Sequence, residues 1–517
     1  MKESISNKII ETKVLSKFSR YTIYVSSIMI LAILTRMYFF EFQLPVNFDA
    51  ISYFLYSSDI YLTRQFPDEW TPTNNGWPIF VSIFFMIFDS KDALTLMQIQ
   101  KILSVIISTL VAIPVYFLCK KFVMKKIAII GVSLIAFEPR LMVNSFLGVT
   151  DPLYLLLITT SLALFLQTNK KIVYISFFVV GLATLVRGEG ITLFVVLSIM
   201  FFIRYREYRF RIIPKYLLVI GIFLIIILPM SSYRIDVIGV DGIFMRSMSS
   251  GNELIGEIIT GEQTGISKFD AVKLFGMVFV WMMIPNFVVL VPLGIILLLK
   301  NRNFEKYTII VSIIILSLPA FYAYINSVLD TRYFFVLLPI YAILFSIGIE
   351  KIVNRLKKST ITILGIIAII FVTSLIFYDY QKPNEVFEIE SFEITKEIFP
   401  IVEKKNSKGM LGYFRVIQVV EQWPMEFPKM KIDAKSISVK GYNSLHEFID
   451  NHRSEGLTHI ITDDREKEIT FLNEVFSENE QIPFLKQVYD SRENNFNYHV
   501  KVFEIDYETY DKVNSSD

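Results

Sequence analysis

The 517-residue chain is rich in apolar side chains, which make up 53% of its residues and include 46 Phe and 26 Tyr. Its formal net charge is only +2, but residues 379–517 hold 27 acidic and 17 basic side chains, so the rest of the chain is basic. This composition excludes a water-soluble globular protein, and the long uncharged runs predict several membrane spans. The single cysteine, Cys119, excludes an intrachain disulfide. All four histidines follow residue 379, which excludes a histidine metal site in the membrane part.

The first apolar run, residues 21–40, follows a basic amino-terminal segment. It is long enough for one span and has no small-residue cleavage signal, which predicts a retained helix. Two interpretations stay open for Arg36 in its last turn: the guanidinium extends to the outer interface, or it helps to hold an anionic ligand there. After an acidic connection, Gly76-Trp77-Pro78 begins a short apolar run to Phe88, whose length is typical of an interfacial or re-entrant helix.

Further apolar segments follow through the rest of the membrane part. They are residues 96–118, 127–137, 153–166, 172–186, 191–203, 212–230, 272–299, 307–325, 333–349 and 361–377. Clusters of Lys and Arg fall at every second connection, and the positive-inside rule makes those connections cytoplasmic. The pattern predicts a multi-pass protein of the cell membrane with about eleven transmembrane helices, a cytoplasmic amino terminus and an outer carboxy-terminal tail.

The change in composition predicts two domains, a transmembrane domain at residues 1–378 and a soluble extracytoplasmic α/β domain at residues 379–517. In the second domain the pattern predicts a helix at 444–452 that Gly456 ends, a strand at 458–462, a helix near 469–476 and a strand pair toward 498–505. Asp463-Asp464 follows a predicted strand, where a turn is favoured over a nucleotide-sugar site, since no glycine-rich phosphate loop lies beside it. We expect this domain to bind the acceptor or a partner.

Charged side chains gather in the connections that this topology places outside the membrane. A charge at the hydrocarbon boundary is costly unless it is paired, solvated or used, so several on one face predict a polar cavity that opens outward. The acidic candidates are Asp49, Glu138, Asp151 and Glu189, and the basic candidates are Arg140, Arg187 and Arg332.

These two kinds of side chain suit one reaction on the outer face. A carboxylate can deprotonate an acceptor hydroxyl or amide, or it can hold a divalent cation such as magnesium or manganese. A guanidinium matches the oxygens of a phosphodiester. Transfer of a sugar from a polyprenyl (dolichyl) phosphate carrier uses both, because the acceptor loses a proton and the departing phosphate gains charge. The sequence therefore predicts a membrane glycosyltransferase with a protein or glycolipid acceptor and no nucleic-acid partner.

The order of these parts resembles the GT-C superfamily of membrane glycosyltransferases, especially the protein O-mannosyltransferase and aminoarabinose transferase relatives. The likeness covers roughly the first 350 residues and depends on the order and shared sidedness of five motifs. They are the outer loop with Asp49, Gly76-Trp77-Pro78, Gly148-Val149-Thr150-Asp151-Pro152, Leu185-Val186-Arg187-Gly188-Glu189-Gly190 and Arg332-Tyr333.

The resemblance implies roles for individual side chains. Asp49 matches the first-loop acid that acts as a base or a metal ligand, and Glu138 or Asp151 would supply the second acid. Arg187 and Arg332 would contact the carrier phosphate. Three further candidates complete the predicted site: Arg140 for the phosphate, and Glu189 and Tyr333 as neighbours, with Asp49 and Asp151 as the candidate metal ligands.

The chain also departs from these relatives. Ala50 follows Asp49 where O-mannosyltransferases carry an adjacent acidic pair, and the Trp-Trp-Asp-Tyr-Gly motif of oligosaccharyltransferases is absent. An oligosaccharyltransferase-like enzyme stays open as an alternative, but it would need a sequon pocket. A flippase or transporter of lipid-linked sugars also stays open, although it would place ionisable groups near the bilayer midplane.

Plain structural interpretations stay open for several candidates. Asp151 can cap a helix that Pro152 begins. The acid–arginine pairs can be local ion pairs, which applies to Glu138 with Arg140, to Arg187 with Glu189 and to Arg332 with Asp330. Residues 231–270 form a longer connection than two helices need, which predicts a mobile loop over the site.

Overall fold

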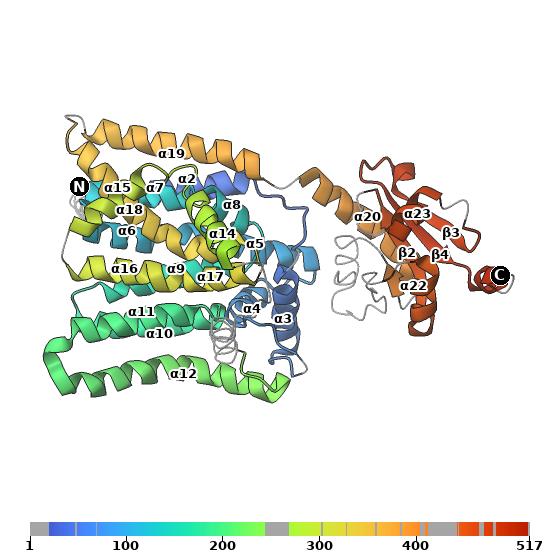
Figure 1. Ribbon diagram of the computed structural model, residues 1–517, viewed down its shortest axis with the longest axis horizontal. Helices are drawn as coiled ribbons and strands as arrows, with labels where there is room; N and C mark the ends of the chain where they lie inside the picture. Colours follow the sequence, from blue (N-terminus) through green and yellow to red (C-terminus); the bar gives the residue numbers. More distant parts are fainter. Residues whose placement is uncertain are drawn as a thin grey trace, which may run out of the picture. The chain divides into compact units, whose positions relative to one another are not determined.

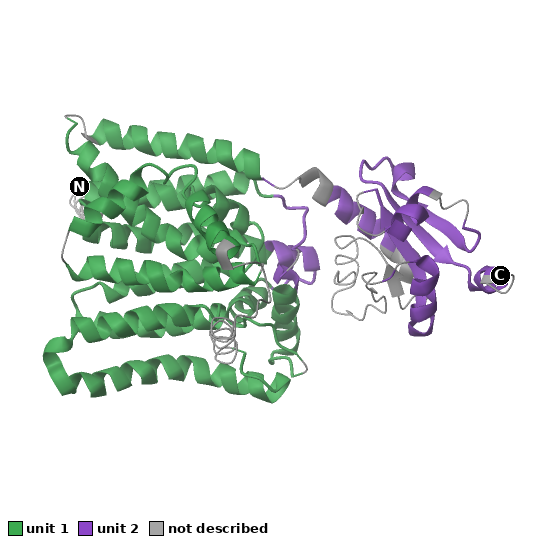
Figure 2. Ribbon diagram, in the orientation of Figure 1, with its two compact units in different colours: residues 1–40, 52–88, 99–381 green, residues 41–51, 89–98, 382–517 purple. Residues whose placement is uncertain are grey.

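The computed structural model describes residues 20–46, 49–68, 70–242, 268–300, 303–326, 328–356, 359–382, 385–403, 409–411, 442, 444–464, 470–478 and 482–514. The chain forms two compact units (Figure 2). Unit 1 comprises residues 1–40, 52–88 and 99–381, and unit 2 comprises residues 41–51, 89–98 and 382–517. The predicted domain boundary after residue 378 stays a prediction.

Unit 1 is built from helices. Its elements are α2 (Arg20–Tyr38), α4 (Gly76–Phe88), α6 (Ala112–Phe122), α7 (Lys125–Ala136), α8 (Pro139–Ser145), α9 (Asp151–Phe165), α10 (Lys170–Val186), α11 (Gly190–Arg204), η1 (Arg206–Arg211), α12 (Ile212–Ile238), α14 (Lys268–Trp281), α15 (Leu290–Lys300), α16 (Phe304–Leu316), α17 (Leu318–Ile325), η2 (Thr331–Leu337), α18 (Leu338–Val353) and α19 (Ser359–Gln381). Two further helices, α3 (Asp49–Thr63) and α5 (Ala93–Leu110), begin in unit 2 and continue into unit 1.

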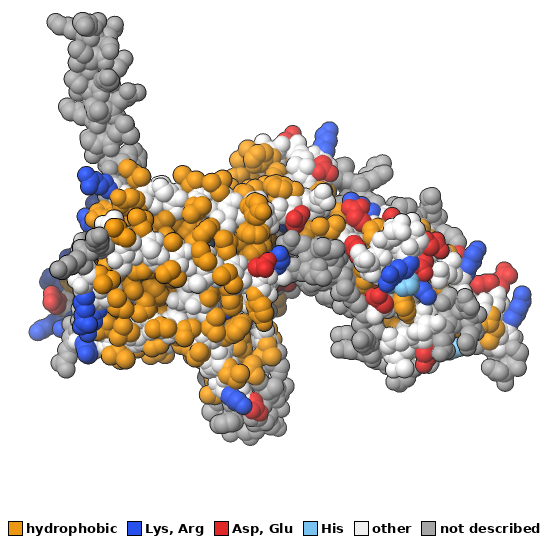
Figure 3. Space-filling view, turned by 90° about the horizontal axis from the view of Figure 1, so that it is seen from above, with side chains coloured by type: hydrophobic (Ala, Val, Ile, Leu, Met, Phe, Trp, Pro, Cys, Tyr) orange, Lys and Arg blue, Asp and Glu red, His pale blue; other side chains and the backbone are white. Residues whose placement is uncertain are grey.

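These helices are apolar enough for a membrane protein. Among the described residues, six helices are long and apolar enough to cross a membrane, and the bent pair of α7 and α8 could make a seventh. The predicted count of about eleven spans is therefore not confirmed. Four more apolar helices are shorter, among them α9 and α11. In Figure 1 α9, α10 and α11 lie side by side, and Figure 3 shows apolar side chains over much of the visible face of unit 1.

Two segments differ from the predicted pattern. Residues 272–299 do not form one helix, because α14 ends at Trp281 and α15 begins at Leu290, with turns between them that contain Pro285. Proline lacks the amide donor that a helix interior needs. The predicted mobile loop at 231–270 begins as helix, because α12 continues to Ile238 and ends at Gly239, whose φ of 74° suits a glycine cap. Residues 243–267 of that loop lie outside the described residues.

Unit 2 contains a small sheet with the order β1-β2-β4-β3, formed by β1 (Gly409–Leu411), β2 (Leu457–Asp463), β3 (Leu485–Asp490) and β4 (Val500–Ile505). The β1–β2 pair is parallel, and the other two pairs are antiparallel. Its helices are α20 (Glu385–Glu403), α22 (Leu445–His452), η3 (Arg453–Glu455), α23 (Thr470–Glu478), η5 (Ser491–Asn494) and α24 (Tyr507–Asn514).

The predicted elements of the tail agree with this unit. Ser444 caps α22 by accepting a hydrogen bond from the Glu447 amide, and Gly456 follows η3 with a φ of 93°. The apolar faces of α22 and α23 pack on the sheet through Phe448, Phe471 and Val475, which are buried. Asp463 ends β2, where its carboxylate accepts a hydrogen bond from the Tyr498 hydroxyl.

Candidate active site

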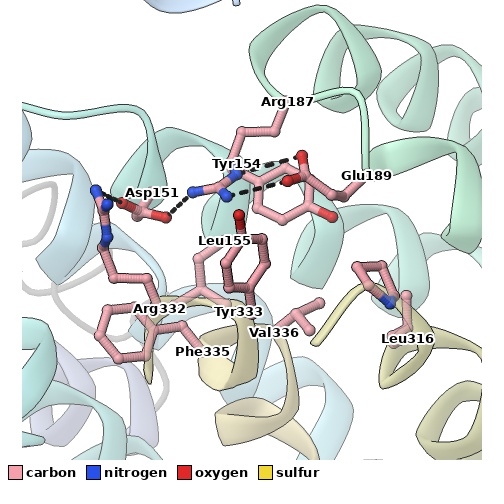
Figure 4. Close-up of a pocket in the computed structure, with 11 residues that line it drawn as sticks. Asp151, Tyr154, Leu155, Arg187, Glu189, Leu316, Arg332, Tyr333, Phe335 and Val336 are labelled. Carbon is pink, nitrogen blue, oxygen red and sulfur yellow. Dashed lines mark hydrogen bonds and ion pairs between the residues drawn. The ribbon is translucent and has the colours of Figure 1, made fainter. Parts of the chain in front are cut away.

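A pocket opens in unit 1 where the start of α9, the turn between α10 and α11, α17 and η2 meet (Figure 4). The residues that line it are Asp151, Tyr154, Leu155, Arg187, Glu189, Leu316, Pro319, Arg332, Tyr333, Phe335 and Val336. Five of these are residues that the sequence selected, namely Asp151, Arg187, Glu189, Arg332 and Tyr333. The structure thus brings together side chains that lie up to 182 positions apart (333 − 151) in the chain.

A hydrogen-bonded turn positions Asp151. Gly148 has a φ of 72°, which favours glycine, and its carbonyl accepts hydrogen bonds from Trp77 Nε1 and Gln100 Nε2, both at 2.8 Å. Thr150 is the residue that precedes α9, so Asp151 is the first residue inside the helix and not its N-cap. The plain capping interpretation therefore does not account for its carboxylate, which contacts the guanidinium groups described below.

Close backbone packing positions Arg187. A Cβ atom added to Gly76 at the start of α4 would lie 2.7 Å from the Val186 amide nitrogen, so only glycine allows α4 to approach the end of α10. Gly190 is similarly close to the backbone of Thr184. The motifs that begin at Gly76, Gly148 and Leu185 are therefore in contact, and together they present Asp151 and Arg187 to the same pocket.

The Arg187 guanidinium lies between two carboxylates. Its Nη1 contacts Asp151 Oδ1, and its Nη2 lies 3.1 Å from Glu189 Oε1. Its Nε donates a further hydrogen bond of 3.4 Å to Glu189 Oε2. The rings of Tyr154 and Tyr333 flank the guanidinium at 5.8 and 5.7 Å. The predicted pairing of Arg187 with Glu189 is present, but Asp151 is an equal partner.

The second oxygen of Asp151 also has partners. Arg332 Nη1 lies 3.8 Å from Asp151 Oδ2, and Asn144 Nδ2 donates to the same oxygen at 3.3 Å. Arg332 also pairs with Asp330, with 2.6 Å between Nε and Oδ2. The side chains of Arg332 and Glu189 are 31% and 29% exposed, whereas that of Asp151 is 5% exposed. The two exposed groups are therefore the ones that an incoming ligand meets first.

This arrangement does not fit a divalent cation at Asp151. A cation needs oxygen ligands that face it, but both Asp151 oxygens face guanidinium or amide donors, and the other carboxylate of the pocket, Glu189, is paired with Arg187. Among the described residues, no group of three or more His, Cys, Asp or Glu side chains could hold a metal ion. We therefore assign no step at this pocket to a metal.

Glu138 and Arg140 do not line the pocket. Arg140 pairs with Glu138 at 3.1 Å and donates to the carbonyls of Ile284 at 2.6 Å and Trp281 at 3.0 Å. Both side chains are buried. The pair thus connects α8 to the segment between α14 and α15, which favours the structural interpretation for both residues.

Two other sequence candidates, Arg36 and Asp49, are not among the residues that line the pocket. Arg36 is fully buried and donates to the Ala136 carbonyl at 2.7 Å, so its guanidinium is enclosed by the protein, and both interpretations of its role stay predictions. Asp49 is the first residue of α3, is exposed, and belongs to the segment 41–51 of unit 2, whereas the pocket belongs to unit 1. Its predicted role as base or metal ligand stays a prediction from the sequence.

Among the site residues that the sequence did not select are two polar ones, Tyr154 and Asn144. Tyr154 lies one helical turn after Asp151, and that spacing could have indicated a side chain on the same face of α9. Asn144 lies in α8, which packs against α9, and no local pattern distinguishes it from other polar residues.

Neither a family model nor a curated protein sequence matches the chain, but solved structures share its fold. The oligosaccharyltransferase of Archaeoglobus fulgidus, in complex with Zn and sulfate, is 14% identical, with a TM-score of 0.57 over 84% of this chain and 68% of that one. ArnT from Cupriavidus metallidurans, bound to undecaprenyl phosphate, is 8% identical, with a TM-score of 0.56 over 93% of this chain and 98% of that one. The archaeal enzyme, AglB, also matches in its complex with an inhibitory peptide and a dolichol-phosphate, at 13% identity and a TM-score of 0.56 over 86% of this chain and 70% of that one.

The fold and the pocket together define a polytopic membrane protein with a polar site at helix ends. Its structural neighbours AglB and ArnT are GT-C superfamily membrane glycosyltransferases, so the predicted GT-C resemblance is confirmed at the level of the fold.

Proposed function

We propose that this protein is an integral-membrane glycosyltransferase that moves a sugar from a polyprenyl phosphate carrier to a protein or glycolipid on the outer membrane face. The observation that carries the proposal is the pocket in which Arg187 and Arg332 share the Asp151 carboxylate. Neighbours bound to dolichol-phosphate and undecaprenyl phosphate support a lipid phosphate as the carrier.

The exposed arginine is the proposed phosphate ligand. The carrier phosphate of a polyprenyl phosphate sugar is a diester with one negative charge, and it becomes a monoester with up to two when the bond to the sugar breaks. Arg332 is partly exposed and can exchange Asp330 for a phosphate oxygen. Because the guanidinium is always charged, it stabilises the added charge as it develops.

The carboxylates are the proposed proton acceptors. In the transfer, the acceptor oxygen or nitrogen forms a bond to the anomeric carbon, the bond from that carbon to the phosphate oxygen breaks, and the acceptor proton passes to a base. Asp151 is one candidate base, because it lies between both arginines in a largely buried position. Asp49 is the other candidate, on the sequence argument alone.

An oligosaccharyltransferase-like activity is the second candidate. The A. fulgidus oligosaccharyltransferase tethered to an acceptor peptide with an NVT sequon shares the fold, at 13% identity and a TM-score of 0.57 over 87% of this chain. Such an activity would use the same pocket for a lipid phosphate but would transfer to an asparagine amide. The acceptor therefore distinguishes the two activities.

One experiment tests the proposal. Purified protein in lipid vesicles is given labelled polyprenyl phosphate sugars with and without Mg²⁺ or Mn²⁺, together with sequon peptides and glycolipids as acceptors. Asp49→Asn is measured beside Asp68→Asn, a matched control in the same outer loop whose side chain is exposed. We expect transfer by the parent and by Asp68→Asn, and a loss of about 100-fold or more in Asp49→Asn if Asp49 is the base.

The other outcomes are equally informative. Full activity in Asp49→Asn would assign the base to Asp151. Transfer to the sequon peptide alone would favour the oligosaccharyltransferase-like activity. Movement of the labelled lipid across the vesicle membrane, without transfer to any acceptor, would contradict the proposal in favour of a flippase.

A further inference from the structure

The position of Arg187 is unusual for a side chain that serves only to bind a ligand. Its guanidinium contacts Asp151 on one side and both oxygens of Glu189 on the other. The guanidinium thus lies between two carboxylates, whose oxygens are ligands of the kind that hard divalent cations prefer. All the groups concerned lie in unit 1 and line the same pocket.

The surroundings of Arg187 hold the guanidinium in that place. Its backbone amide donates to the Ala183 carbonyl at 2.9 Å, which fixes the residue at the end of α10. The rings of Tyr154 and Tyr333 both lie within about 6 Å of the guanidinium, where cation–π contact favours a cation. Its side chain is only 12% exposed, so water gives it little alternative solvation.

The second arginine adds a further obstacle to a metal ion. Arg332 approaches the other Asp151 oxygen, and Asn144 donates an amide hydrogen to it. A divalent cation at Asp151 would thus lie close to two positive guanidinium groups, and it would have to displace at least one of them.

We propose that Arg187 is a built-in cation that closes the Asp151–Glu189 site to divalent metals. The catalytic consequence of this inference depends on the glycosyl transfer proposed above. In that reaction Arg187 supplies the positive charge beside Asp151, and the Asp151 carboxylate binds no metal.

The test is to remove the guanidinium and ask whether a metal takes its place. Arg187→Met keeps a side chain of similar length without charge, and Arg187→Lys is the matched control that keeps the charge. The full-length parent and both variants are purified in lipid nanodiscs. Manganese binding is measured by electron paramagnetic resonance and by metal analysis after gel filtration, and the melting temperature is measured with and without Mn²⁺.

We expect Arg187→Met to bind one additional Mn²⁺ per chain, at least tenfold more tightly than the parent, and to gain melting temperature when Mn²⁺ is added. Arg187→Lys should behave as the parent does. The double variant Arg187→Met/Asp151→Asn should lose the added binding, which would assign it to this site.

Two results would overturn the inference. One is Mn²⁺ binding by the parent that disappears in Asp151→Asn. The other is a folded Arg187→Met protein, shown by gel filtration and a cooperative melting curve, that gains no Mn²⁺. Because these measurements need no sugar donor, the inference about metal exclusion can hold even if no labelled donor is turned over, in which case only the proposed transferase function fails.

Discussion

Two acid–arginine pairs in unit 1 look alike in the sequence but differ in their surroundings. Glu138 and Arg140 are two residues apart, as are Arg187 and Glu189. Arg140 completes its hydrogen bonds with main-chain carbonyls of a distant segment, and both members of its pair are buried. Arg187 pairs with two side chains, and its partner Glu189 is 29% exposed.

The difference teaches what each pair can do. An arginine that donates to buried carbonyls cannot change partners without leaving them unsatisfied, so it holds helices together. A partly exposed arginine that pairs with carboxylates at a pocket, as Arg332 does beside Arg187, can exchange one anion for another at small cost, because charge and hydrogen bonding are both preserved. The Arg187–Arg332 cluster therefore suits a ligand site, and the Arg140 pair suits a structural contact.

The largest effect is expected from Asp151→Asn. The substitution removes one of the two candidate proton acceptors and the negative charge that both arginines share, so we expect transfer to fall by about 10²- to 10⁴-fold. The protein should remain folded, because an amide can still accept hydrogen bonds from Arg187. The measurement is kcat per folded molecule. Glu138→Gln is the matched control, and an equal loss of kcat there would show that the two acids do not differ in role.

The second-largest effect is a loss of stability, which we expect from Arg140→Met. Removing this guanidinium leaves the Glu138 carboxylate and two carbonyls buried without their donor, which costs about 3–5 kcal/mol. Thermal unfolding in detergent should show the loss, while kcat per folded molecule stays near that of the parent. If Arg140→Met instead unfolds like the parent but no longer binds the donor, Arg140 is a ligand residue and the contrast with Arg187 disappears.

A smaller effect is expected from Arg332→Met. Loss of a charge-assisted hydrogen bond to the carrier phosphate should raise the KM for the donor by about 10- to 100-fold. Because Arg332 is 31% exposed, the melting temperature should change much less than in Arg140→Met. Arg332→Lys restores the positive charge without the planar guanidinium, so its KM for the donor should lie between that of the parent and that of Arg332→Met. A change in kcat with no change in KM would argue against phosphate binding by Arg332.

The fold could be predicted largely from patterns that act locally. Apolar runs indicated most of the helices, and the tail elements followed from Ser444, Gly456 and alternating strands. The failures came from segments whose local pattern was ambiguous. Residues 231–238 are polar enough for a loop but continue α12, and Pro285 interrupts an apolar run that otherwise looks like one span. The number of spans could not be fixed, because short helices such as α9 are enclosed by other helices and need not match the length of a span.

The site could be predicted only in part, for a different reason. Asp151, Arg187 and Arg332 were selected because charged side chains at helix ends are costly unless used. The same argument selected Arg140, and nothing within its own motif shows that its partners are Ile284 and Trp281, more than 140 positions away. Long-range contacts decide which charged groups meet, and a single sequence does not contain them.

The smallest effect is expected from an ion pair at the protein surface. This pair adds a well-exposed case to the comparison of the buried Glu138–Arg140 pair with the partly exposed Arg187–Glu189 pair. Arg453 and Asp511 in unit 2 form two contacts of 2.5 and 2.9 Å, and both side chains are well exposed. The hydrogen bonds from Arg453 lower the pKa of Asp511 below its ordinary value. The ionised Asp511 carboxylate therefore contributes its full stabilisation above the pKa that it has in the unfolded chain, about 4. This contribution is lost as the pH falls through the lower pKa that Asp511 has in the folded protein.

Asp511→Asn should accordingly weaken unit 2 only slightly at pH 7, because solvent and salt screen an exposed pair. The difference from the parent should disappear once the pH is below the folded pKa. Hydrogen exchange of α24 in the full-length protein, followed as the pH is lowered from 7 until the parent and the variant no longer differ, measures this directly. A destabilisation at pH 7 as large as that of Arg140→Met would mean that exposure does not separate the ion pairs of this protein, and the distinction between the structural pair and the pocket cluster would then need another physical basis.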